Sequence, residues 1–198
     1  MFFRLNVRLL LAAFFVTAAV PVFSQVVPSA TQGRLPLVVG GGVSDYYTDW
    51  SGRLLGPSVW VDWNLYRGPS VLRGFGLEAE GRDLNYDRTG YTPNLRQDTA
   101  LGGVRYTFHR FRDLHPYAKF LAGIGSIDFT LAGDPYYKHD TRTVIAPGGG
   151  LEYRVWRNAW VRADYEYQFW SELFNTGALN PQGLTLGVSY DLGNIHRR

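Results

Sequence analysis

The chain has 198 residues, no cysteine and a formal net charge of +3 at pH 7. The length suits a single domain, and the lack of cysteine excludes a disulfide framework and a lipidated N-terminal cysteine. Hydrophobic residues make up 45% of the chain, aromatic residues 16%, and there are 23 glycines, yet the mean hydropathy is only −0.16. Apolar and polar residues are therefore interleaved, which favours β structure with tight turns over helices.

The first 24 residues have the pattern of a secretory signal peptide. Arg4 and Arg8 form a positive start, and Leu9–Val20 is an apolar run that is too short to span a bilayer as a helix. Pro21 ends the run, and we expect cleavage near Ser24. The alternative is an N-terminal core helix. The stretch that follows is polar and contains proline, so it offers such a helix nothing to pack against. We therefore expect an exported chain.

Removing this segment weakens the case for a nucleic-acid partner. Without Arg4 and Arg8 the chain has 18 basic and 17 acidic residues, a net charge of +1. These charges are dispersed rather than gathered in a patch, so we expect no nucleic-acid binding. The predicted organisation is a signal peptide at 1–24, a short periplasmic segment at 25–34, a β-barrel at 35–193 and a tail at 194–198.

Residues 159–169 show the pattern on which the fold prediction depends. Val161 and Tyr165 fall on one face of a strand, and Arg162 and Asp164 fall on the other, because successive strand side chains point to opposite faces. A transmembrane barrel places the apolar face against lipid and the charged face toward its lumen. The pattern recurs in eight segments of about ten residues, the length that tilted membrane-spanning strands need. These segments are 35–43, 56–66, 74–84, 97–108, 116–129, 143–155, 159–169 and 183–192.

The expected connections alternate in length. The short ones are 67–73, 110–114 and 156–158, and the longer ones are 44–53, 85–96, 132–142 and 171–181. This alternation is typical of outer-membrane barrels, which have short periplasmic turns and longer outside loops. Pro147 predicts a bulge in its strand, and residues 123–127 predict a change of phase. We therefore predict an all-β fold, an eight-stranded antiparallel up-and-down transmembrane β-barrel.

The polar faces of these strands assign twelve charged residues to the lumen. An eight-stranded barrel is just wide enough for its own side chains, and buried charges must be paired and hydrogen-bonded. We expect a salt-bridged plug, with a narrow ion channel as the alternative. The predicted network contains Asp62, Glu78, Glu80, Arg82, Arg105, Lys119, Glu152, Arg154, Arg162, Asp164, Glu166 and Asp191.

A soluble, lipocalin-like ligand binder is the alternative architecture. It would place the apolar faces inside a small lumen, which their aromatic residues would overfill. In the membrane barrel these aromatics face lipid instead: Trp63, Tyr106, Phe108, Tyr153, Tyr165, Tyr167 and Phe169.

Several segments, in order, resemble a known family. They are 103–108, 116–117 with 123–125, 148–154 with 165–167, and 185–192. Together they resemble the eight-stranded outer-membrane β-barrel family that includes the OmpA membrane domain, OmpX and the opacity-type proteins. The last segment is similar to the family's C-terminal assembly signal, carried here by Thr185, Gly187, Tyr190 and Leu192, although the strand ends on leucine rather than on the usual aromatic residue.

The resemblance implies a place in the bacterial outer membrane, with outer-membrane lipid, lipopolysaccharide and the barrel-assembly machinery as partners. The expected function is a structural or surface-interaction role, with a possible surface ligand. The alternative is a lipid-modifying acyl hydrolase or transferase, a class that shares this architecture. The chain lacks the His-x-Ser pair that the acyl hydrolases of this class use. The remaining feature in favour of an enzyme is His139–Asp140, which lies in a predicted outside loop.

No catalytic, cofactor-binding or metal-binding residues are expected. The chain has no Gly-x-Ser-x-Gly elbow, and its histidines and carboxylates lack the spacing of a metal site. The glycine triplets at 40–42 and 148–150 do not open helices, so they are not phosphate loops.

Overall fold

The computed structural model describes residues 37–48, 52–64, 74–87, 95–108, 113–130, 137–173 and 177–192. The predicted signal peptide, the segment at 25–34 and the tail at 194–198 lie outside the described residues. Within the described ranges, no helix has the length and apolar character needed to cross a membrane.

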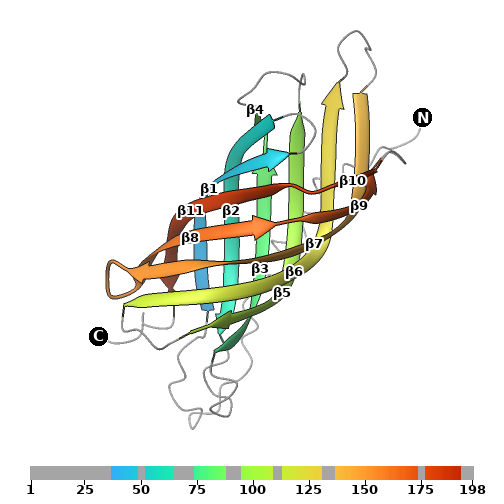
Figure 1. The fold of residues 1–198 in the computed structure, drawn as a ribbon. Helices are drawn as coiled ribbons and strands as arrows, with labels where there is room; N and C mark the ends of the chain where they lie inside the picture. The colour runs from blue at the N-terminus through green and yellow to red at the C-terminus, as the bar shows by residue number, and fades with distance from the viewer. Residues whose placement is uncertain are drawn as a thin grey trace, which may run out of the picture. The chain divides into compact units, whose positions relative to one another are not determined.

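The described residues form a closed antiparallel barrel (Figure 1). Its elements are β1 (Leu37–Thr48), β2 (Gly52–Asn64), β3 (Phe75–Leu84), β4 (Tyr86–Asp87), β5 (Arg96–Thr107), β6 (Leu114–Thr130), β7 (Tyr137–Arg154), β8 (Ala159–Tyr167), β9 (Phe169–Leu173), β10 (Gly177–Leu179) and β11 (Gln182–Asp191). Each long strand pairs with its neighbour in the chain, and β1 pairs with β11 to close the sheet. Because β8 and β9 pair with β7 in succession, and β10 continues into β11, the barrel has eight strands, which confirms the predicted fold class.

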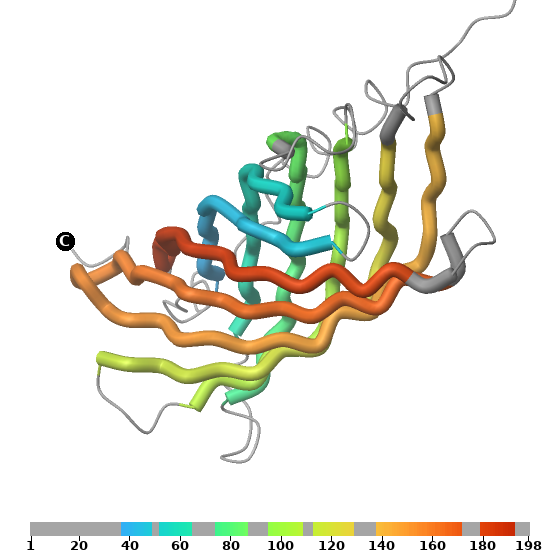
Figure 2. The backbone as a smooth tube through the Cα atoms, turned by 45° about the horizontal axis from the view of Figure 1, so that its top comes forward, coloured from blue at the N-terminus to red at the C-terminus, as the bar shows by residue number. Residues whose placement is uncertain are grey.

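The two ends of the barrel differ in how far the strands extend. We call the end where β1 begins and β11 ends the base, and the opposite end the rim. The hairpin of β6 and β7 contains the longest strands, of 17 and 18 residues. Figure 2 shows these two strands side by side along their length and reaching beyond their neighbours at the rim.

Side-chain exposure alternates along the strands. In β2, the side chains of Val59 and Trp63 are exposed, whereas Ser58, Trp60 and Asp62 are buried. This alternation follows from the two-residue period of a strand. The barrel therefore has an apolar outside and a largely polar inside over the strand segments nearest the base.

Pro147 causes no bulge, so that prediction was wrong. β7 pairs with β6 without a register shift, and Phe120 stands opposite Pro147. On its other side, the pairs Ile145–Phe169 and Gly148–Glu166 share one register, so no residue is added. The neighbouring strand is interrupted instead, between β8 and β9, where the backbone N–H of Gln168 donates to the carbonyl of Pro181 at 2.7 Å. The missing N–H of proline is therefore accommodated at a gap in the neighbouring strand.

The predicted change of phase at residues 123–127 was also wrong. β6 pairs continuously with β5, from the Arg96–Asp128 pair to the Thr107–Tyr117 pair. Gly123 and Gly125 keep the inward positions because space there is short. A Cβ atom on Gly125 would lie 2.3 Å from the Trp170 ring. Because glycine occupies these two inward positions, the alternation of side chains along the sequence looked interrupted there although the strand is regular.

The strands run into segments that were predicted as outside loops. β1 and β2 cover all but three residues of the predicted loop at 44–53, and β7 begins at Tyr137, inside the predicted loop at 132–142. Backbone N–H and C=O groups need hydrogen-bond partners beyond the apolar band as well, and continued strand pairing provides these partners. The outward side chains on the extended parts of the strands include polar residues. Asp45 and Arg53, for example, form an outward ion pair of 2.7 Å on β1 and β2.

Candidate functional site: the barrel lumen

Ten of the twelve charged residues predicted for the lumen are buried and joined by ion pairs. We call this set the lumen network: Asp62, Glu78, Glu80, Arg82, Arg105, Lys119, Glu152, Arg162, Asp164 and Glu166. The other two lie at the base, where their strands end. Arg154 pairs with the exposed Asp113 at 2.6 Å. Asp191 is half-buried.

Lys119 is the centre of the lumen network. Its Nζ lies 2.7 Å from a carboxylate oxygen of Glu80, 3.0 Å from Asp164, 3.0 Å from Glu166 and 3.3 Å from Glu78. Glu78, Glu80 and Asp164 bring ligand oxygens within 4.8 Å of one another, the arrangement that a metal ion would need. The ammonium group of Lys119 already supplies the positive charge there.

Arg162 joins three strands across the lumen. Its Nη2 donates to Glu78 and to Asp164, at 2.6 Å in each case, and its guanidinium carbon lies 4.6 Å from the centre of the Trp60 ring. A planar guanidinium can pair with carboxylates in its plane and stack on an aromatic face at the same time. The arginine is therefore held by both charge and packing.

Arg105 and Arg82 hold the two ends of the network. Arg105 lies 2.6 Å from Asp62 and 2.6 Å from Glu152 near the base. Arg82 pairs with Glu80 and with Glu166, and lies 4.3 Å above the Tyr46 ring.

Three aromatic residues that contact the arginines of the lumen network were absent from the predicted site: Tyr46, Trp60 and Tyr117. Strand alternation places Trp60 and Tyr117 inward, and that signal could have included them. Tyr46 fell in a predicted loop, so alternation was not applied to it. Its hydroxyl donates to Glu166 at 3.1 Å.

The lumen toward the rim is largely apolar and holds uncharged polar side chains such as Gln97 and Gln168, whereas the prediction filled the lumen with charges. A buried cluster there contains Tyr46, Leu54, Leu84, Leu95, Leu101, Leu121, Ile127, Val144, Ala146, Trp170 and Leu179. We call it the apolar plug. The lumen therefore has two layers, with paired charges nearer the base and close-packed apolar side chains nearer the rim.

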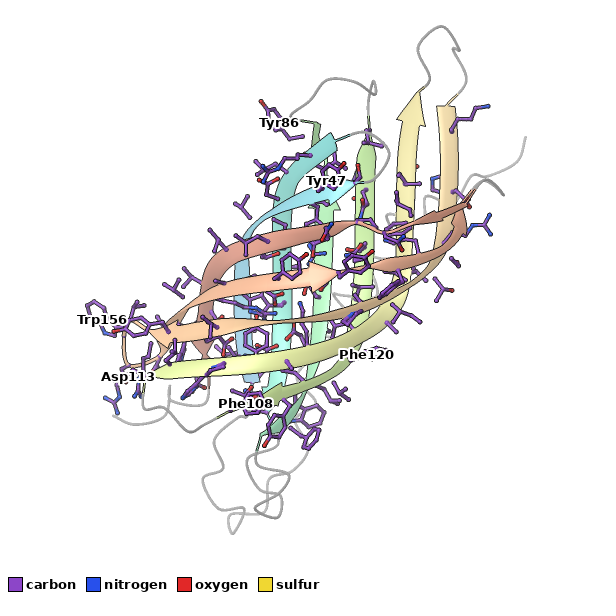
Figure 3. All side chains as sticks on the ribbon, in the orientation of Figure 1. Tyr47, Tyr86, Phe108, Asp113, Phe120 and Trp156 are labelled. Atoms are coloured by element: carbon purple, nitrogen blue, oxygen red, sulfur yellow. The ribbon has the colours of Figure 1, made fainter. Side chains whose placement is uncertain are left out.

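The aromatic residues predicted to face lipid lie on the outside of the barrel. Trp63, Phe108 and Tyr153 are about half exposed. Tyr106 packs edge-on between Phe75 and Phe108, with ring centres 4.9 and 4.8 Å away. Figure 3 shows Phe120 and Phe108 on the outside, with Trp156 and Asp113 at the base and Tyr47 and Tyr86 at the rim.

His139 does not form the pair with Asp140 that was considered for catalysis. It lies on β7, and adjacent strand residues point to opposite faces. Its Nδ1 contacts Asp128 and lies 3.4 Å from the Ser126 hydroxyl, while Asp140 pairs with Arg142. A Ser-His-Asp triad needs the serine and the carboxylate on different ring nitrogens. Ser126 and Asp128 both face Nδ1, so Ser126 is not placed as the serine of a triad, and Nε2 of His139 instead lies 3.2 Å from the Thr141 hydroxyl.

An outward polar group lies toward the rim, beyond the exposed apolar residues of β3 and β5. Arg96 lies 2.9 Å from Asp83 and 3.1 Å from Asp98.

The comparisons with known proteins agree with this geometry. A family model described as the outer membrane protein beta-barrel domain matches residues 9–191. No match was found among curated protein sequences.

Three of the solved structures that share the fold show the extent of the likeness. Neisserial surface protein A has 15% identity and a TM-score of 0.63, over 79% of this chain and 97% of that one. Ail of Yersinia pestis has 16% identity and a TM-score of 0.53, over 78% and 96%. OprG of Pseudomonas aeruginosa has 12% identity and a TM-score of 0.51, over 80% and 97%. At these identities the likeness shows the fold alone.

Proposed function

Since this chain belongs to the outer membrane protein β-barrel domain family and resides in the bacterial outer membrane, we propose that it has a structural or surface-interaction role there, without catalysis and without a solute-sized pore. The outward apolar side chains face the lipid, and the inward charges are shielded from it. The barrel then acts as a rigid anchor, and the rim is the part available to other molecules.

The observation that carries this proposal is the two-layered filling of the lumen. A solute would have to separate ion pairs such as Arg162–Glu78 and then displace the apolar plug. Separating one partner from a well-buried pair costs about 3–5 kcal/mol, and the network contains several such pairs. Most of the apolar plug is aliphatic, and the buried amides beside it, Gln97 and Gln168, are hydrogen-bonded to each other, so few groups there can replace the water of a hydrated ion.

The surface part of the proposal rests on the rim. The hairpin of β6 and β7 extends beyond the neighbouring strands (Figure 1), and outward charges such as Arg53 and Arg96 lie at the rim ends of β2 and β5. Exposed guanidinium groups suit phosphates of lipopolysaccharide headgroups. One structural relative, Ail, is named an attachment invasion locus protein, which is consistent with a surface role for this fold.

Planar-bilayer recording tests the absence of a pore. We expect the purified protein to insert without steady conductance at the level of a wide porin. A double variant with Trp170→Ala and Leu121→Ala should loosen the apolar plug. Its conductance is therefore compared with that of the unmodified protein. Steady, porin-sized conductance from the unmodified protein would contradict the proposal.

A further inference from the structure

We draw no further inference here: the strongest candidate, the outward groove of about 350 Å³ over Gly81 between β2, β3 and β5, carries none, because its two aspartates, Asp83 and Asp98, are already paired with Arg96 and nothing in the described part of the chain shows what covers it.

Discussion

Replacing Arg162 by alanine should destabilise the barrel far more than removing an exposed arginine. The side chain is 1% exposed and lies 2.6 Å from Glu78, 2.6 Å from Asp164 and 3.7 Å from Asp62. Its loss would remove one of the cations that these carboxylates contact, leaving Lys119 for Glu78 and Asp164 and Arg105 for Asp62. Removing one partner of a buried pair costs about 3–5 kcal/mol, and the lost packing against Trp60 adds to this.

Arg53→Ala is the matched control for this experiment. Arg53 also pairs with a carboxylate at 2.7 Å, but its side chain is 56% exposed. Exposed pairs contribute about 0–1 kcal/mol. Urea unfolding of both variants in detergent, followed by tryptophan fluorescence and heat-dependent gel mobility, measures the difference. Equal unfolding midpoints for the two variants would refute the inward placement and pairing of Arg162.

Three further outcomes are expected. The folded protein should migrate differently in SDS before and after boiling, and an absent shift together with recovery from the soluble periplasm would contradict the barrel. Deleting residues 88–94 or 131–136, which lie between described strands, should leave insertion and the heat shift intact, whereas loss of folding would make these segments part of the scaffold. Incubation with lipid A and phospholipid, analysed by mass spectrometry, should show no acyl loss or transfer, and a product that disappears in His139→Ala would reverse that expectation.

The sequence alone was sufficient for the number of strands and their two faces, but not for where the strands end at the rim. A two-residue period is local, so it can be read from 159–169 without knowing any partner, and it assigned Arg162, Asp164 and Glu166 to one side. The eight-strand count followed from the recurrence of that period. The same local rule failed where residues of unusual size interrupted it, as at Gly123 and Pro147, because the space and pairing that accommodate them belong to neighbouring strands.

Only the tertiary structure decided which inward groups meet. Alternation cannot show that Arg162 of β8 reaches Glu78 of β3, because these strands are not neighbours and their relative height depends on the stagger of every pair between them. The same holds for Lys119 at the centre of four carboxylates, and for the leucines and Trp170 that close the lumen toward the rim. His139 contacts Asp128 rather than Asp140 for a related reason. Pairing of β6 with β7 places Asp128 directly opposite His139, whereas the side chains of adjacent residues such as His139 and Asp140 point to opposite faces of the strand.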